Sequence, residues 1–340
     1  MTILSKKVIW SAKIVVLLTV FLGGCAPVRE QVGQPKAKVE KDQQAKVEKD
    51  QPATIALKFA VGDTTIYKVV TEYKKSARFE GSLAEKAEFK SGSTGNKVKM
   101  TFSRQIKSVD DAGNAVVKIT IKSLKYSAIV KDEVKLDFDS ADVSKNKHSL
   151  SKLIGQSYTI QLSPSGEFLR LVDAKDALAA VGEANNIAKS LIGNKAVKLR
   201  HGTIALPSAD KNKLRKGESW SDSKEFTFGM LGGKSYQRVY TLKEITDKNG
   251  RKVASIEMET APGSDAETFQ KEQIEAFSKM FDSTDTYTGQ LELDLTDGKI
   301  EKYSEQMKSE WVVVDPKKDE ENPDMIIMGA VRSYSIERVD

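Results

Sequence analysis

The chain has very few of the side chains on which thiol and imidazole chemistry depend. It contains one cysteine and two histidines among 340 residues. A single cysteine excludes an internal disulfide, and an acylated cysteine would leave no thiol for catalysis or metal binding. The sequence also lacks a Gly-x-Ser-x-Gly elbow, a phosphate loop and a dinucleotide fingerprint. These absences predict a protein that is not an enzyme and that uses no cofactor.

Long runs of one residue type are equally scarce. After residue 25, no apolar run approaches the roughly 20 residues that a membrane helix needs. The 54 basic and 48 acidic residues give a net charge of +6, and lysine and glutamate are interspersed along the chain. Mixed charge of this kind is typical of a solvated surface, so we predict no nucleic-acid binding.

Residues 1–24 have the order of a secretory signal peptide. A start with three lysines is followed by an apolar stretch over residues 14–22 and then by Leu22-Gly23-Gly24-Cys25. This ending resembles the bacterial lipobox, and the resemblance implies cleavage before Cys25 and acylation of its sulfur. Two or three acyl chains anchor a protein stably, because each buried methylene contributes about 0.8 kcal/mol. The alternatives are a transmembrane anchor and an ordinary signal peptide with an incidental cysteine.

The same resemblance implies a place for the mature protein in the cell envelope. Residue 26 is alanine and not aspartate, which resembles the signal for an outer-membrane lipoprotein that faces the periplasm. The membrane is then a partner through the lipid on Cys25. Residues 25–54 are rich in charged and amide side chains and repeat Ala37–Gln43 as Ala45–Gln51. Such a segment buries too little to fold alone, and we interpret it as a flexible tether, with a short surface helix as the alternative.

The folded body is expected over residues 55–340 and to be mainly β. Residues 116–122 and 290–296 alternate apolar and polar side chains, as half-buried antiparallel strands do. Turn sequences with a glycine suited to positive φ separate such runs. These turns are centred near Gly113, Gly166, Gly250 and Gly298.

The turn and strand signals recur in the same order in two parts of the body. Val61-Gly62-Asp63-Thr64 begins one series, and Lys216-Gly217-Glu218-Ser219 begins the other. The segment Thr159–Gly166 also aligns with Leu291–Gly298. We therefore predict two related β-meanders over residues 55–172 and 213–340, against the alternative that all antiparallel proteins reuse such turns.

Two helices are expected beside the strands. The first joins the two halves over residues 174–192, with Asp173 as its N-cap and Gly193 as its stop. The second covers residues 265–281 after a capping box at Ser264. Its apolar face could belong to the core or could cover an apolar cavity, and consists of Phe269, Ile274, Phe277 and Met280.

The expected fold is thus α+β but mainly β, an antiparallel meander that forms an open or half barrel with two or more helices. This arrangement resembles the half-barrel of periplasmic lipoprotein carriers. The order of weak motifs is also similar to that of a family of uncharacterised bacterial envelope lipoproteins. These motifs are Val61-Gly62-Asp63, Phe138-Asp139-Ser140, Leu153-Ile154-Gly155, Leu162–Gly166, Lys216–Trp220 and Gly289–Gly298. That resemblance implies location and architecture but assigns no catalytic residues.

Few side chains are candidates for chemistry. His148 and His201 lie in polar or turn-like sequence and are interpreted as surface histidines, not metal ligands. Two acidic groups could hold Ca²⁺ or flank a glycosidic bond, although neither has the pattern of a calcium loop. We interpret both as solvated turns or caps: Asp137, Asp139 and Asp142, and Asp282 and Asp285.

Trp220 and Trp311 lie in expected strands and are interpreted as packing residues more than as ligand platforms. The functional hypothesis is a non-enzymatic, membrane-anchored lipoprotein that binds an apolar ligand such as lipid. The alternative is a structural lipoprotein with a filled core that presents its surface to a protein partner. An enzyme that uses carboxylates ranks third.

Overall fold

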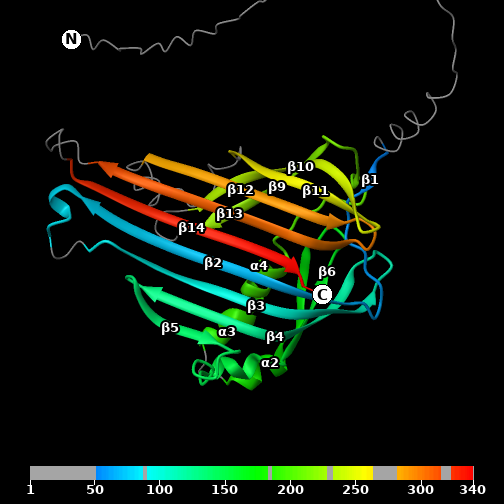
Figure 1. The fold of residues 1–340 in the computed structure, drawn as a ribbon, viewed down its shortest axis with the longest axis horizontal. Coiled ribbons are helices and arrows are strands. Elements are labelled where there is room, and N and C mark those ends of the chain that lie inside the picture. The colour runs from blue at the N-terminus through cyan, green and yellow to red at the C-terminus, as the bar shows by residue number, and fades with distance from the viewer. Residues whose placement is uncertain are drawn as a thin grey trace, which may run out of the picture. The chain divides into compact units, whose positions relative to one another are not determined.

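The computed structural model describes residues 51–86, 90–182, 186–227, 233–262, 282–314 and 323–339. These residues belong to a compact unit that begins at Glu48. They form one antiparallel sheet of twelve strands, a separate pair of short strands, and three short α-helices (Figure 1). The sheet is open, with β7 and β9 at its two ends. The prediction of a mainly β fold with an open antiparallel meander is confirmed.

The strands follow one another through the sheet as two consecutive meanders. We call β2–β7 the first half and β9–β14 the second half, and they meet where β2 pairs with β14. The order along the sheet is β7 (Phe168–Asp173), β6 (Ser157–Leu162), β4 (Ala115–Val130), β3 (Gly92–Val109), β2 (Thr64–Glu80), β14 (Met325–Arg338), β13 (Lys299–Val314), β12 (Asp282–Asp294), β11 (Arg251–Pro262), β10 (Gly233–Lys248) and β9 (Ser219–Thr227), while β5 (Glu133–Asp139) pairs with the far end of β4.

A glycine corner begins each half in the same way. In the first half, the Gly62 amide donates to the Ile106 carbonyl at 2.9 Å, and the Ile106 amide donates to the Asp63 carbonyl at 2.9 Å. In the second half, the Gly217 amide donates to the Leu242 carbonyl at 2.7 Å. The Leu242 amide then donates to the Glu218 carbonyl at 3.0 Å. Both glycines have φ near +90°, which a residue with a Cβ adopts only with strain.

The strand register also repeats from half to half. A β-bulge follows Ile106 in the first half and Leu242 in the second. In the first half, Ile106 pairs with Val117, and Val117 pairs in turn with Ile160. In the second half, Leu242 pairs with Ile256, and Ile256 pairs in turn with Leu291. Ile160 therefore corresponds to Leu291, so the alignment of Thr159 with Leu291 was wrong by one residue. Whether the halves share an origin stays a prediction.

The predicted turns are confirmed, and so are the predicted strand faces except at the end of β12. All four glycines of the predicted turns have φ between +63° and +81°: Gly113, Gly166, Gly250 and Gly298. In β4, Val117, Ile119 and Ile121 are fully buried, as the alternation of apolar residues predicts. Leu291 and Leu293 are buried in β12 in the same way. The strand ends at Asp294, which is fully buried and not on the solvent side as the alternation over residues 290–296 predicted.

The linking segment forms three helices where one was predicted. α2 (Lys175–Val181) ends at Gly182, whose φ of +78° cannot continue a helix, and α3 (Asn186–Ile192) follows. The N-cap of α2 is Ala174 and not the predicted Asp173, although the Asp173 carboxylate accepts the Lys175 amide at 3.0 Å. α4 (Asn194–His201) begins after Gly193 and was not predicted. The second predicted helix, residues 265–281, lies outside the described residues. The described residues also include two 3₁₀ turns, η2 (Gly81–Leu83) and η3 (Ser149–Leu153).

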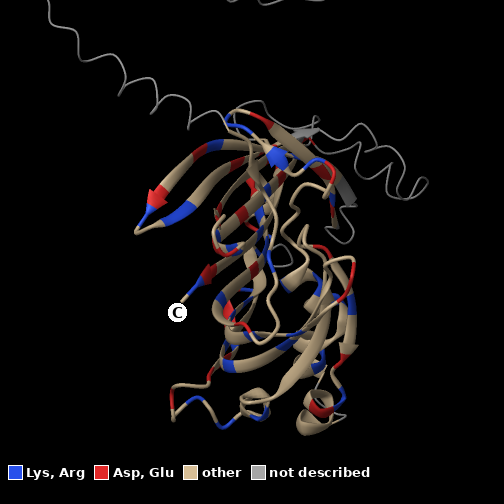
Figure 2. Ribbon diagram, turned by 90° about the vertical axis from the view of Figure 1, so that its right-hand side faces the viewer, with Lys and Arg blue, Asp and Glu red and all other residues tan. Residues whose placement is uncertain are grey.

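The three helices pack on one face of the sheet, which we call the helix face. α2 contacts β6 and α4 contacts β7, and in Figure 1 α3 and α4 lie behind β3 and β4 while α2 is seen below β4. Figure 2, turned by 90°, shows the same helices to one side of the strands. The main apolar core lies between helices and sheet, and it includes Phe102, Tyr158, Leu191 and Val197.

Backbone hydrogen bonds tie residues 53–58 to one end of the sheet. β1 (Ala53–Thr54) pairs with β8 (Lys213–Leu214). The Leu57 amide donates to the Pro164 carbonyl at 2.8 Å, and the Lys58 amide donates to the Gly298 carbonyl at 3.0 Å. Residues 53 and 54 therefore belong to the folded body and not to the predicted tether. The rest of that tether before residue 51 lies outside the described residues.

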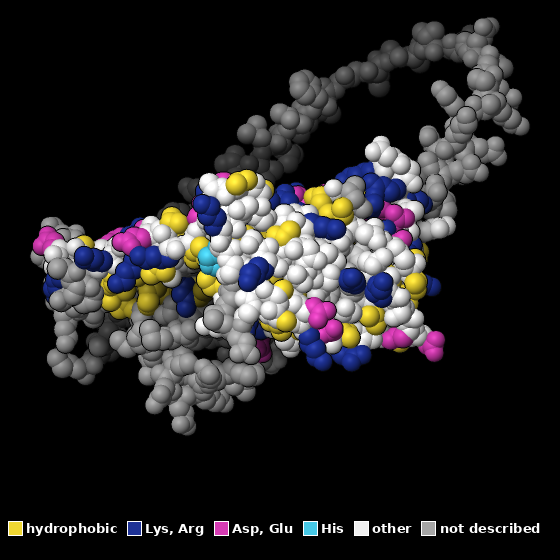
Figure 3. All heavy atoms as spheres, turned by 90° about the horizontal axis from the view of Figure 1, so that it is seen from below, with side chains coloured by type: hydrophobic (Ala, Val, Ile, Leu, Met, Phe, Trp, Pro, Cys, Tyr) yellow, Lys and Arg dark blue, Asp and Glu magenta, His cyan; other side chains and the backbone are white. Residues whose placement is uncertain are grey.

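Side chains of both charge signs are scattered over the face of the molecule seen in Figure 3. The surface in that view has no stripe of one sign. Among the helices that the structure describes, none combines the length and the apolar character that a bilayer crossing requires.

Candidate ligand-binding site

A cavity of about 260 Å³ lies between α4 and the strands where the two halves meet. α4 contributes Lys195 and Leu199, which are four residues apart and so project from the same side of the helix. Leu199 is 50% exposed, which places an apolar side chain at the mouth. The remaining lining comes from β2, β3, β9, β12, β13 and β14.

Most of the cavity wall is apolar or aromatic. Strand alternation brings Phe226 and Met307 to the helix face, where both are buried. The rings of Phe226 and Tyr287 meet edge to face, with centroids 6.4 Å apart. Tyr73 and Tyr334 complete the aromatic lining. This wall suits an apolar ligand, with polar atoms confined to a few positions.

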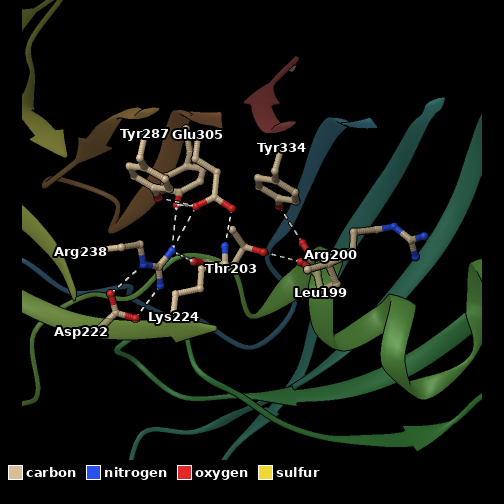
Figure 4. A network of polar contacts seen from close by, with 10 residues as sticks. Leu199, Arg200, Thr203, Asp222, Lys224, Arg238, Tyr287, Glu305 and Tyr334 are labelled. Atoms are coloured by element: carbon tan, nitrogen blue, oxygen red, sulfur yellow. Dashed lines mark hydrogen bonds and ion pairs between the residues drawn. The ribbon is translucent and has the colours of Figure 1, made fainter. Parts of the chain in front are cut away.

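The polar positions centre on the buried carboxylate of Glu305 in β13 (Figure 4). Lys224 of β9 forms an ion pair with this carboxylate. The hydroxyls of Tyr287 and Tyr303 donate to its Oε2 at 2.6 and 3.0 Å. Arg238 of β10 donates to the same oxygen from Nη1 at 3.2 Å. Charged groups from β9 and β10 therefore reach a carboxylate on β13 across the helix face.

Arg238 also connects the strands to the chain that follows α4. Its Nε and Nη2 donate to the two carboxylate oxygens of Asp222, at 2.8 and 2.5 Å. Its Nη1 donates to the Thr203 carbonyl at 3.0 Å. A guanidinium matches a carboxylate in this two-point geometry and keeps donors for further partners. Arg238 thus joins two strands, the helical segment and Glu305.

The protonation states in this network follow from burial and from neighbouring charge. Burial alone would raise the pKa of Glu305, but Lys224 and Arg238 outweigh it and hold that pKa below its ordinary value. Burial raises the pKa of Tyr287 and of Tyr303, and the Glu305 charge raises both further. At neutral pH the network therefore contains an ionised carboxylate and neutral phenol donors.

A larger hollow of about 590 Å³ lies on the opposite face of the same central strands. Its side chains are mainly hydroxyl, amide and carboxylate groups, including Thr288, Gln290, Ser304 and Ser333. Glu72 at its edge is already paired with Lys97 at 3.0 Å. It offers few apolar side chains, so the smaller cavity on the helix face is the better candidate for an apolar ligand.

The two histidines have structural roles. His148 is half-buried, and its Nδ1 accepts the Leu150 amide at 3.2 Å, which caps η3. His201 is partly buried, with its ring 5.2 Å from Phe102 and its Nε2 2.8 Å from the Tyr158 hydroxyl. The interpretation of His201 as a surface histidine was therefore wrong, because the end of α4 turns it toward β3 and β6. Burial, followed by Arg200 and Arg104, lowers its pKa well below the ordinary value.

The first acidic group forms turn and ion-pair contacts, as predicted. Asp137 pairs with Lys145, and Asp139 pairs with Lys125 at 3.1 Å. Asp142 accepts the amide of Ser144 at 2.9 Å. In the second group, both residues lie in β12 and not in a turn: Asp282 and Asp285. Asp285 accepts the Tyr236 hydroxyl at 2.7 Å.

Both candidate tryptophans pack as predicted. The Trp220 ring stacks on Tyr240 with centroids 4.9 Å apart, and its Nε1 donates to the Ala205 carbonyl at 3.0 Å. Trp311 is 2% exposed and lies in a small apolar cluster with Phe226. Over the residues the structure describes, no group of three or more potential ligands could hold a metal ion. Cys25 and the apolar face of residues 269–280 lie outside those residues.

Sequence reasoning missed the charged residues of the helix face. Lys224, Arg238 and Glu305 are polar, and polar residues in a strand are ordinarily assigned to the solvent side. The spacing of residues along β13 could have identified Glu305. Tyr303, Glu305 and Met307 are two positions apart, so their side chains must lie on the same face of the strand. Two large apolar neighbours of the same parity indicate that Glu305 faces the core.

Comparisons with known proteins give little for this chain. No family model and no curated protein matches it. One similar solved structure is described as "Lipid-protein interactions in lipovitellin". The identity is 14%, the TM-score is 0.42, and the alignment covers 83% of this chain. It spans 26% of the other chain, about a quarter of that protein. A likeness of this size does not extend to ligand or function.

Proposed function

We propose that the protein is a non-enzymatic lipoprotein of the bacterial envelope that binds the apolar part of a lipid-like ligand in the cavity beside α4. The observation that carries the proposal is the mainly apolar cavity of about 260 Å³ on the helix face. Well-packed interiors have few voids larger than a water molecule. This cavity is much larger and opens at Leu199 between α4 and the strands, which is typical of a binding site more than of a packing defect.

The cavity dimensions favour one apolar chain. Its volume equals that of roughly nine water molecules at about 30 Å³ each. Pockets for whole small molecules usually begin near 300 Å³. A ligand would therefore bury a short chain segment inside and extend the rest past Leu199 at the mouth.

The anchoring part of the proposal rests on the sequence of residues 1–25. An acylated Cys25 would attach the body to the outer membrane on its periplasmic side, with residues 26–52 as the tether. Lipid or a lipidated protein would then be the partner in the envelope. Mass spectrometry of the membrane-extracted protein tests this part, because an N-terminal peptide that begins with diacylated Cys25 is the expected product.

Binding is tested with the compact unit Glu48–Asp340 and the neutral apolar dye N-phenyl-1-naphthylamine, whose fluorescence rises in apolar surroundings. We expect saturable binding of about one dye per chain. Leu199→Lys places a charge at the mouth and should weaken binding about tenfold, equivalent to about 1.4 kcal/mol.

Leu169→Lys is the matched control, because Leu169 is 40% exposed on β7 and does not line the cavity. It should leave dye affinity unchanged. If both variants bind the dye as well as the unsubstituted chain, the cavity is not the dye site. If the folded protein binds no dye, the alternative of an interaction lipoprotein with a filled core is favoured.

A further inference from the structure

The hollow of about 590 Å³ on the face opposite the helices has a regular floor of polar side chains from β12, β13 and β14. We call these six neutral residues the polar grid: Thr288, Gln290, Ser304, Gln306, Ser333 and Ser335. The strand register arranges them in two parallel rows of three. One row runs from Thr288 through Gln306 to Ser333, and the other three residues form the second row. Strand spacing and the two-residue repeat give the grid dimensions of about 10 by 7 Å.

The hydrogen-bonding groups of the polar grid are left available. Among the residues that the structure describes, no side chain of the grid forms a hydrogen bond with another protein group. Elsewhere on the same face, Thr120 and Ser157 are cross-strand partners whose hydroxyls lie 2.8 Å apart in a hydrogen bond. Ser304 and Ser335 are cross-strand partners in the same way, but their hydroxyls do not bond each other. The grid therefore keeps its donors and acceptors for a ligand or for water.

The charged side chains at the edges of the hollow bind one another. Glu72 pairs with Lys97 at 3.0 Å, and Glu257 pairs with Lys243 at 2.9 Å. The hydrogen bond and charge of Glu257, followed by the charge of Glu259, raise the pKa of Lys243. The middle of the hollow is thus formed by hydroxyl and amide groups, which are neutral and both donate and accept hydrogen bonds.

We propose that this hollow binds a neutral oligosaccharide across β12, β13 and β14. A saccharide presents closely spaced hydroxyls that also donate and accept, so it can match several members of the polar grid at once. Val70 lines the hollow next to Ser335 and offers an apolar contact for the C–H groups of a sugar ring. The volume lies within the range of about 300–1,000 Å³ for sites that hold a whole small molecule.

A peptide fits this place less well. The backbone groups of β13 and β14 are used in strand pairing on both sides, so a peptide cannot bind there as an added strand. The saccharide site is separate from the apolar cavity, because the two lie on opposite faces of the sheet. It therefore goes beyond the proposed function and does not depend on it.

The test titrates the unit Glu48–Asp340 with three neutral trisaccharides, cellotriose, maltotriose and tri-N-acetylchitotriose, and follows backbone amide shifts by NMR. We expect at least one of them to bind with a dissociation constant of about 1 mM, since each neutral hydrogen bond contributes modestly. The shifts should be largest in β12, β13 and β14. Tetraethylene glycol, whose ether oxygens only accept, should bind at least about tenfold more weakly.

Gln306→Met removes the amide from the centre of a row and should weaken saccharide binding about fivefold. Gln237→Met is the matched control, because Gln237 is exposed on the same face of β10 and does not line the hollow. It should leave saccharide affinity unchanged. Both variants should bind N-phenyl-1-naphthylamine as the unsubstituted chain does, because the dye cavity lies on the other face.

Three results would overturn the saccharide site. They are no binding of any trisaccharide at about 10 mM, ten times the expected constant, equal binding of tetraethylene glycol, or equal effects of the two glutamine substitutions. None of them bears on the apolar cavity, which the dye tests separately.

Discussion

Tyr67 and Phe102 face each other across β2 and β3 in the first half of the sheet, and Asp222 and Arg238 face each other across β9 and β10 in the second. The two pairs stand at the same distance along their strands from the glycine corners. An aromatic pair in one half thus corresponds to an ion pair in the other. The backbone frame alone does not determine which kind of pair it carries.

At the neighbouring positions, too, the first half has apolar or large side chains where the second half has polar or small ones. Val69 and Met100 of the first half correspond to Lys224 and Tyr236 of the second. Tyr158, a large buried side chain of the first half, corresponds to Gly289 of the second half. The two residues correspond because they pair with equivalent positions of β4 and β11. The first half therefore fills its helix face with apolar side chains and helices. The second half crosses its face with a hydrogen-bonded network and leaves the volume that the cavity occupies.

The largest loss of stability among these variants is expected when the Arg238 side chain of the second half is removed. Arg238→Met leaves Asp222 and Glu305 without a shared guanidinium in a buried setting. Breaking a buried ion pair on one side costs about 3–5 kcal/mol. Urea unfolding should show a loss of that size with an unchanged m-value.

A double variant can replace the ion pair of the second half by the aromatic pair found at the same position in the first half. Asp222→Tyr combined with Arg238→Phe removes both charges together, and replacement of a whole buried pair is often nearly neutral. We expect it to be at least 2 kcal/mol more stable than Arg238→Met, although Glu305 keeps only Lys224 as a cation. If the single and double variants are equally unstable, the network does not hold this half together.

Gly289 is the second point at which the halves diverge. A Cβ at this position would lie 1.8 Å from Met258 Cε and 3.1 Å from the Ser304 carbonyl oxygen. Gly289→Ala should therefore destabilise the protein by about 1–3 kcal/mol through overpacking. Addition of Met258→Ala removes the closest contact, so a double-mutant cycle in urea should give a favourable coupling of about 1 kcal/mol. Additive losses would show that Met258 does not fill the space above the glycine.

His201, which packs against Phe102 and Tyr158 of the first half, and Glu305 of the second half should respond to acid at different pH. Burial keeps the folded-state pKa of His201 well below 6.5, so the unfolded chain binds a proton first as the pH falls. Its contribution to stability is complete above pH 6.5 and is lost as the pH falls below that value. The lowered pKa of Glu305 gives a loss only below its unfolded-state value, near 4.5.

His201→Gln isolates the first of these effects. Between pH 7.5 and 5.5, the original chain should lose about 1 kcal/mol more stability than the variant does. Chemical unfolding at the two pH values measures the difference. Identical losses in both proteins would mean that His201 becomes protonated as readily in the folded state as in the unfolded chain.

Much of the fold could be predicted from the sequence, because its turns and strand faces depend on local features of the chain. The glycine turns and the apolar alternation of β4 and β12 follow from φ preferences and from the two-residue period of a strand. The helical linker was also found, but its division was not, since Gly182 lies within an otherwise favourable pattern. α4 was missed because its sequence, Asn194–His201, is mostly polar and gives a weak apolar stripe.

The candidate site was not predictable in the same way. Glu305 becomes a site residue because strand curvature brings β9 and β10 across to β13, and no local pattern encodes that approach. Lys195 and Leu199 depend likewise on where α4 crosses the sheet. The interpretation of Asp137 and Asp139 as ordinary surface acids was confirmed because their lysine partners lie within 14 residues along the chain.

The smallest expected loss of stability concerns the glycine corner that both halves share. Gly62→Ala and Gly217→Ala each place a Cβ on a residue with φ near +90°, and no atom lies within 4 Å of either new Cβ. Backbone strain is therefore the whole cost, about 1 kcal/mol at each site. Because the corner hydrogen bonds are the same, the two losses in urea unfolding should agree within about 0.5 kcal/mol and should add in the double variant. A difference of more than about 1 kcal/mol would mean that the side chains around each corner, and not its backbone geometry, determine its stability.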